Sequence, residues 1–153
     1  MSRGPEANFW NQIRQNLPKK CFATRIENKH GGGVPDVHMV WDGLPFGMEL
    51  KVSKSNAVKI SPHQVAWNMA YWARGGLNFY LVKRASTQEI LLFGGNQGPE
   101  VRDQGCLAPC ALRVGSVPDL FCALRPVLTG LLRSNRGLLA VKKKKKGPLA
   151  PGV

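Results

Sequence analysis

Asp42-Gly43 is the feature that most constrains how this chain folds, because it predicts a tight turn between two strands. Residues 37–41 alternate well enough in polarity for one strand, and residues 48–52 are typical of another. Asp-Gly is characteristic of two-residue hairpin loops, in which both loop residues adopt positive φ angles. Such a loop makes Trp41 the partner of Leu44 and sets the register of an antiparallel hairpin.

Periodicity and Gly or Pro punctuation predict a folded core over residues 1–93. Pro5 suits the first turn of a helix that Pro18 ends, and Ser61 and Gln64 suit a capping box that opens a second helix. The predicted helices and strands cover residues 5–17, 21–26, 37–41, 48–52, 62–73, 78–82 and 89–93. Their order is α-β-β-β-α-β-β, and the largely apolar strand at 78–82 is expected to be central.

Positive charge dominates the composition: the 153 residues carry 22 Lys and Arg against 9 Asp and Glu, a net charge of +13. Nucleic acid is therefore the first expected partner, and an anionic membrane surface the second. No apolar run approaches the length that crosses a bilayer, and no export signal is visible. We expect a cytoplasmic protein of a bacterial or phage-infected cell, without a membrane partner. Cys106 and Cys110 lack a second ligand pair, which disfavours a zinc site.

The sequence after Phe93 is richer in turns and more basic, and it divides into an extension over residues 94–140 and a tail over 141–153. The extension is predicted to hold an amphipathic helix that starts at Ser116 and is kinked at Pro126. The apolar face of that helix comprises Val117, Leu120, Phe121, Leu124, Val127, Leu128 and Leu131. Packing on the core is favoured over a partner interface.

The tail contains five consecutive lysines at positions 142–146, whose repulsion predicts an extended, disordered segment. Such a run adds sequence-independent affinity for nucleic acid that falls with salt. A localisation signal has the same appearance, so the run does not distinguish the two roles.

The predicted hairpin brings two carboxylates and a lysine together. With a two-residue turn Asp36 lies opposite Glu49, and Lys51 shares the face of Glu49 because side chains alternate along a strand. A four-residue loop would place Asp36 opposite Lys51, and a three-residue loop would break the convergence. On spacing alone, the solvated face of a hairpin is as good an explanation as a site with chemistry.

Two like charges side by side on a sheet are costly without a counter-charge, and a divalent cation supplies one. Carboxylate oxygens suit Mg²⁺ or Mn²⁺, which keep several waters and accept phosphate oxygens as ligands. The ion would activate a bound water and polarise phosphorus, while Lys51 would hold that water or offset charge on the phosphate. This chemistry is the hydrolysis of a phosphodiester.

Pro35-Asp36 followed by Glu49-Leu50-Lys51 resembles the motif of the PD-(D/E)XK nuclease superfamily. The order helix, three strands, helix and strand also resembles the restriction-endonuclease-like fold of that superfamily, an α/β fold with a mixed β-sheet flanked by helices. The resemblance implies a metal-dependent DNA endonuclease. Its metal ligands would be the carboxylates of Asp36 and Glu49 and the Leu50 carbonyl, and Lys51 would be the catalytic lysine.

Two further positions resemble archaeal Holliday-junction resolvases and VRR-NUC nucleases. Glu6 lies on the apolar stripe of the first predicted helix, where those proteins carry a glutamate that reaches the metal site. Ser61 and Gln64 resemble the Ser-x-x-Gln that opens the helix after their E-x-K strand. The resemblance assigns Glu6 to the metal and Gln64 to its support. The plainer explanations are helix-dipole stabilisation for Glu6 and a capping box for Gln64.

Contacts with DNA and with a second copy are expected around this site. Candidates for phosphate contacts are Lys54, Lys59, Lys83 and Arg84. The second predicted helix has two wide stripes, Val65, Met69 and Trp72 beside Gln64, Trp67 and Tyr71. A homodimer interface is favoured over stacking on splayed bases, because the resembled resolvases are two-fold dimers.

These features together predict a Mg²⁺- or Mn²⁺-dependent DNA endonuclease that acts on a Holliday junction or other branched DNA. A restriction or homing-type nuclease is an alternative that the same motif serves, and a non-catalytic nucleic-acid-binding protein is another. A junction enzyme cuts four-way DNA symmetrically, a restriction or homing type cuts linear duplex at defined positions, and a binding protein cuts neither.

Overall fold

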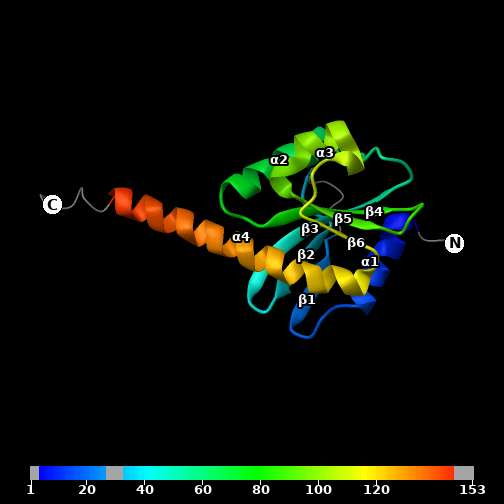
Figure 1. Cartoon of the computed structure of the whole chain (residues 1–153), viewed down its shortest axis with the longest axis horizontal. Helices are drawn as coiled ribbons and strands as arrows, with labels where there is room; N and C mark the ends of the chain where they lie inside the picture. Colours follow the sequence, from blue (N-terminus) through cyan, green and yellow to red (C-terminus); the bar gives the residue numbers. More distant parts are fainter. Residues whose placement is uncertain (1–3, 27–32, 147–153) are drawn as a thin grey trace, which may run out of the picture.

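The computed structural model describes residues 4–26 and 33–146, with backbone alone for 135–146. The first helices and strands follow the predicted order α-β-β-β-α-β-β, and a short helix, a strand and a long helix come after them (Figure 1). The elements are α1 (Pro5–Gln15), β1 (Cys21–Arg25), β2 (Val37–Trp41), β3 (Leu44–Ser53), α2 (Pro62–Ala73), β4 (Asn78–Arg84), β5 (Ile90–Gly94), η1 (Gly95–Gln97), α3 (Gly98–Gln104), η2 (Gly105–Leu107), β6 (Leu112–Val114) and α4 (Val117–Lys146).

All the strands belong to one mixed sheet in the order β1-β2-β3-β4-β5-β6. β3 and β4 are parallel and are joined by α2, whereas the other neighbours are antiparallel. β4 lies inside the sheet, as its apolar sequence predicted. The α/β class and the mixed sheet are therefore confirmed, with one strand more than the sequence predicted.

The Asp42-Gly43 turn forms as predicted, with φ angles of 52° and 83°. Trp41 pairs with Leu44, and the ladder continues until Val37 pairs with Met48. β3 begins at Leu44 rather than at Met48, because a two-residue turn lets pairing start directly after it. The register on which the predicted site depends is therefore the one that the structure adopts.

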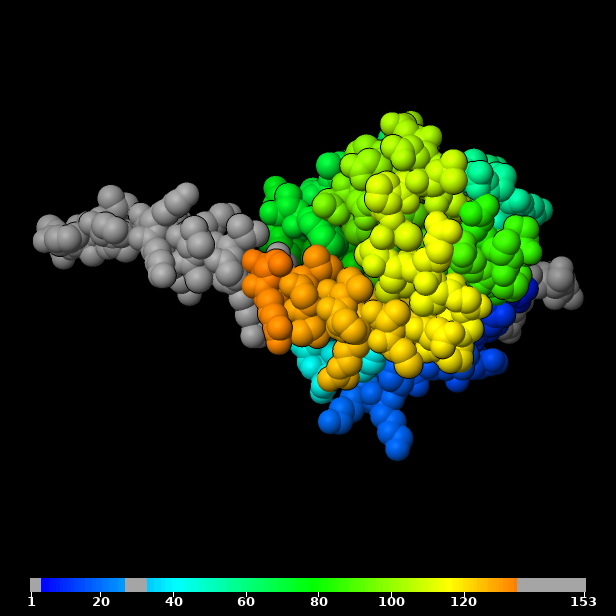
Figure 2. Space-filling view, in the orientation of Figure 1, coloured from blue at the N-terminus to red at the C-terminus, as the bar shows by residue number. Residues whose placement is uncertain are grey.

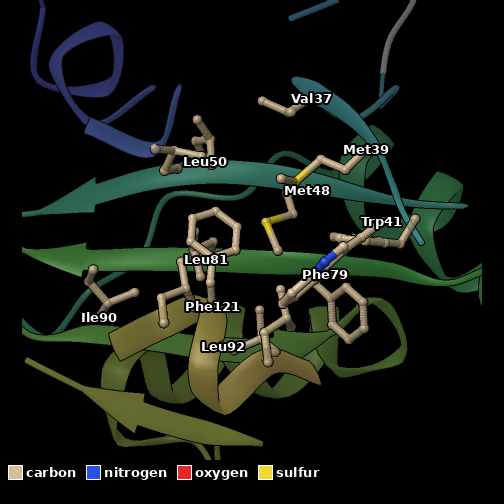
Figure 3. Close-up of a cluster of buried hydrophobic side chains, with 14 of the residues drawn as sticks. Val37, Met39, Trp41, Met48, Leu50, Phe79, Leu81, Ile90, Leu92 and Phe121 are labelled. Carbon is tan, nitrogen blue, oxygen red and sulfur yellow. The ribbon is translucent and has the colours of Figure 1, made fainter. Parts of the chain in front are cut away.

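One face of the sheet is covered by α1 and α4. The main core cluster joins Phe9 and Ile13 of α1, alternate residues of the strands, and Phe121 of α4. Figure 3 shows Leu50, Leu81 and Leu92 of neighbouring strands in this cluster, near Phe121. The predicted packing of the amphipathic helix on the core is confirmed.

The opposite face is covered by α2, α3 and the segment that precedes α2. A second core cluster forms there from Tyr80, Val82, Leu91 and Phe93 of the sheet, with Val101 of α3. α2 buries little: Asn68 is its one buried residue. Met69, which the sequence placed on an apolar stripe, is 40% exposed. On this face α2 therefore buries fewer of its side chains than α4 does on the opposite face.

The extension shares the sheet and the core of the N-terminal segment. β6 pairs with β5, and α4 crosses the face seen in Figure 2 next to β6. None of the helices in the described part is both long and apolar enough to span a membrane.

α4 continues through Pro126 and is helical to Lys146. The sequence predicted an extended run over 142–146, so this part of the prediction differs from the structure. Lysine is a good helix former, and lengthening an existing helix avoids the cost of nucleation. Residues 147–153 of the predicted tail lie outside the described residues.

Candidate active site

Asp36 and Glu49 lie next to each other where β2 begins beside β3. The hairpin register pairs Val37 with Met48 and so puts Asp36 opposite Glu49, one step further along. Asp36 Oδ2 accepts a hydrogen bond of 3.0 Å from the backbone N–H of Leu50, which holds the carboxylate against β3. The structure brings together the two carboxylates that a two-residue turn predicted.

Lys51 and Gln64 contact the same oxygen of Glu49. Lys51 Nζ lies 3.7 Å from Glu49 Oε1, and Gln64 Nε2 donates a hydrogen bond of 2.5 Å to that atom. Lys51 Nζ also donates a hydrogen bond of 3.2 Å to Gln64 Oε1. The three side chains form a closed triangle, which orients the Lys51 ammonium and occupies Oε1 of Glu49.

Glu49 is buried with its other oxygen unsatisfied. The residue is 2% exposed, and Oε2 has no hydrogen-bond partner among the described residues. Burial, and after it the charge of Asp36, raises the pKa of the Glu49 carboxyl to about 8 against the opposing effect of Lys51. A buried carboxylate oxygen without a partner costs free energy unless a cation or a donor reaches it.

The donors fit a divalent cation. Two adjacent carboxylates, one with an oxygen that no described residue contacts, are the hard donors that Mg²⁺ and Mn²⁺ accept, with waters completing the shell. Within residues 4–26 and 33–146, no three His, Cys, Asp or Glu side chains form a metal-binding group by themselves. The side-chain donors in this fit are therefore Asp36 and Glu49.

Glu6 approaches the site from the first turn of α1. Partial burial raises the pKa of its carboxyl; the charge of Lys51 lowers that pKa, Asp36 raises it and Arg25 lowers it. Glu6 and Lys51 also line the same cavity. The Glu6 carboxyl thus interacts electrostatically with this cluster from an exposed position on the surface. Its assignment as a metal ligand stays a prediction.

Gln64 is held by hydrogen bonds at both its side chain and its backbone. Ser61 Oγ accepts from the Gln64 backbone N–H and Gln64 Oε1 accepts from the Ser61 N–H, both at 3.1 Å, so the predicted capping box is confirmed. The Gln64 backbone carbonyl accepts from Asn68 Nδ2 at 2.7 Å and from the Tyr80 hydroxyl at 3.4 Å. The same residue therefore caps α2 and reaches Glu49.

Sequence reasoning missed Asn68 and Tyr80. Asn68 lies one helical turn after Gln64 in an otherwise apolar stretch, and a polar residue at that position was a usable signal. Tyr80 is embedded in an apolar strand, where nothing local indicates that its hydroxyl reaches α2. Arg25 was also missed, because its place beside Glu6 depends on the pairing of β1 with β2.

The segment that leads into Asp36 packs closely on α2. Gly33 has a φ of +92°, and a Cβ at this position would lie 2.5 Å from the backbone oxygen of His63 and 2.7 Å from Trp67 Cβ. Only glycine allows this approach. The sequence also predicts that the loop over residues 30–33 adapts to a DNA groove, and residues 30–32 of it lie outside the described residues.

The predicted phosphate-binding cations divide into two pairs. Lys54 and Lys59 line a cavity of about 340 Å³ together with Lys51. Lys83 instead donates a hydrogen bond to α1 and lines a different cavity, and Arg84 donates to the loop after β3. The structure brings Lys54 and Lys59 to the site and leaves Lys83 and Arg84 outside the cavities around it.

No protein-family model and no curated protein matches this sequence. Among solved structures, the fold is similar to that of Archaeoglobus fulgidus Hjc, a Holliday junction resolvase from an archaeal hyperthermophile. The similarity has a TM-score of 0.46 and 14% sequence identity, and it covers 60% of this chain and 75% of that one. The similarity concerns the fold alone.

Proposed function

We propose that this protein is a metal-dependent DNA endonuclease that hydrolyses phosphodiester bonds. The observation that carries the proposal is the buried Glu49, whose Oε1 is held by Lys51 and Gln64 while its Oε2 has no partner in the described part of the chain. A hairpin with a structural role alone gains nothing from a second carboxylate opposite this one. A divalent cation, which both carboxylates would hold, would account for the arrangement.

In the proposed mechanism Asp36 and Glu49 would hold Mg²⁺ or Mn²⁺, with the Leu50 carbonyl as a further oxygen ligand and Glu6 in support. Such an ion would lower the pKa of a water and offset charge on the phosphate. Lys51, oriented by Gln64, holds the attacking water or offsets the charge that develops on the phosphate in the transition state. The water oxygen bonds to phosphorus while a P–O bond to the sugar breaks.

DNA is the proposed substrate because the net charge of +13 favours a polyanion. Among DNA structures we favour the Holliday junction or other branched DNA, since Glu6 and Gln64 match positions of the resolvases that the sequence resembles. A homodimer is part of the proposal. Its proposed contact is the exposed side of α2, where the Trp67 and Tyr71 rings stack with centroids 4.9 Å apart.

Cleavage of a labelled four-way junction, beside linear duplex of the same sequence, tests the proposal. Asp36→Asn and Lys51→Ala should each lower the cleavage rate by about 1,000-fold or more, because several kcal/mol of transition-state stabilisation are lost. EDTA should have the same effect. Asp42→Asn is the matched control, because Asp42 lies in the hairpin turn and pairs with Arg125.

The outcomes separate the candidate functions. Symmetric cutting of the junction alone, dependent on metal and on Asp36, supports the resolvase. Defined cuts in linear duplex support a restriction or homing-type nuclease on the same site. Binding of DNA without cleavage in Mg²⁺ or Mn²⁺ refutes the enzyme and leaves a nucleic-acid-binding protein, and wild-type rates in Lys51→Ala refute the site.

A further inference from the structure

Two cavities adjoin next to the candidate site. The cavity of about 340 Å³ is lined by Glu6 and by residues between 51 and 59, and another of about 550 Å³ is lined by Gln64 and Arg102 among others. The two share Lys51, Val58 and Lys59 as lining residues. The two cavities together are called the groove below.

Arg102 lies on α3, in the part of the chain that the sequence did not connect with the site. The position of α3 is set by packing, because Val101 is fully buried in the second core cluster. Gly98 lies close to the Tyr80 hydroxyl and to Val65 of α2, where a Cβ would approach within 3.1 Å of each. α3 is thus anchored against the sheet and α2, and it presents Arg102 at the far end of the groove.

The lining of this groove is basic. Its cations are Lys51, Lys54, Lys59 and Arg102. Glu6 is its one carboxylate among the described residues, since Glu100 and Asp103 of α3 do not line it. Lys51 is engaged with Glu49 and Gln64, whereas Arg102 is exposed and takes part in none of the ion pairs between described residues.

We infer that Arg102 binds a backbone phosphate that flanks the reacting one, on the Gln64 side of Lys51. Lys54 occupies the corresponding place on the other side, so that one nucleic-acid strand lies along the groove with its reacting phosphate at Lys51. A guanidinium suits this role because it is always charged and contacts phosphate oxygens with two parallel hydrogen bonds. The inference rests on the proposed function, and it assigns substrate binding to the C-terminal part of the fold.

Equilibrium binding to the four-way junction in EDTA tests this inference separately from cleavage. Arg102→Ala should weaken binding by about fivefold to tenfold and reduce the slope of log affinity against log salt by about 1, as expected for one lost phosphate contact. Arg102→Lys should keep the slope and lose part of the affinity. Arg14→Ala is the matched control, an exposed arginine on α1 that lines neither cavity.

A merely structural role for Arg102 would lower the melting temperature and leave the salt slope unchanged. That result, or wild-type affinity and slope in Arg102→Ala, overturns the inference while the proposed nuclease stands. Intact binding with the expected Arg102 effect but no cleavage in Mg²⁺ or Mn²⁺ overturns the nuclease and keeps the phosphate contact. Absence of junction binding by the wild-type protein overturns the inference itself.

Discussion

Successive residues of β3 are equally buried and chemically opposite. Met48 and Leu50 are 1% and 2% exposed in the core formed with α1 and α4, and Glu49 between them is 2% exposed on the other face. Burial of the apolar side chains stabilises the fold by about 25 cal/mol per Å². Burial of Glu49 removes hydration from a carboxylate and raises its pKa. One face of the strand stabilises the fold, and the other carries a cost in free energy that the proposed metal site would offset.

The largest expected effect separates activity from stability at Glu49. Glu49→Gln should lower the cleavage rate by about 1,000-fold or more, because a metal ligand is lost. Its free energy of unfolding should be unchanged or higher above about pH 8, because the amide keeps the shape and removes the charge that Glu49 carries there. Junction cleavage and urea unfolding measure the two quantities, with Glu89→Gln as the control.

On the apolar face the expectation is reversed. Leu50→Ala should lower the free energy of unfolding by about 2–5 kcal/mol, the usual cost of a cavity in a packed core. Urea unfolding measures this loss, and cleavage by the remaining folded protein should be affected far less than in Glu49→Gln. A loss below about 1 kcal/mol would show that this face is not the stabilising one.

The pH dependence of stability sharpens the contrast further. The pKa of Glu49 is about 8 in the folded protein against an ordinary value of 4.5, so the folded state holds the proton more tightly. The stabilisation that comes from the protonated Glu49 is therefore fully present below about pH 4.5, and it is lost as the pH rises toward about 8. The expected loss is about 5 kcal/mol in EDTA, from the difference between the two pKa values at about 1.4 kcal/mol per pKa unit, and Glu49→Gln should remove it.

Melting temperatures between pH 5 and 9 check this dependence. Mg²⁺ at pH 8 should restore the stability of the wild-type protein and leave Glu49→Gln unchanged, because ligand binding to the folded state stabilises it. The same pH slope in both proteins would mean that Glu49 is not the group responsible.

The smallest effect concerns the support of Gln64. Asn68→Ala removes the hydrogen bond to the Gln64 carbonyl. The loss of about 1 kcal/mol of free energy that orients Gln64 should lower kcat by roughly fivefold with little change in KM. Tyr80→Phe, which removes the longer bond, should have a smaller effect. Single-turnover cleavage measures both, and a change in KM alone would contradict a positioning role.

The site on the polar face of β3 could be predicted wherever it depends on residues that are close together in the sequence. The Asp42-Gly43 turn, the alternation of side chains and the capping box of Ser61 and Gln64 involve residues close in sequence, so they could be inferred without the fold. That was enough to place Asp36, Glu49 and Lys51 together. The hydrogen bond from Tyr80 could not be inferred, because it depends on how α2 lies across β4, whereas the bond from Asn68 joins residues four apart within α2.

The basic residues near the site also divide into those that the local sequence places and those that tertiary packing places. Lys54 and Lys59 follow β3 closely and reach the groove as predicted, whereas Lys83 and Arg84 are engaged with α1 and with the loop after β3. Arg102 enters the groove only because α3 folds back against α2. Arg102 was not predicted because it is far from the site residues in the sequence. Arg84 was predicted because it is closer to them in the sequence.

The sequence by itself determined the hairpin register, the element order and the meeting of two carboxylates with one lysine. These follow from turn chemistry and from the two-residue period of a strand, which act over a few residues. Only the tertiary structure decided that β6 and α4 complete the sheet and its core, that one oxygen of Glu49 is buried with no partner among the described residues, and that Arg102 lines the groove. Those features arise from packing between segments far apart in the chain, where the burial of apolar surface sets the arrangement and no local pattern records it.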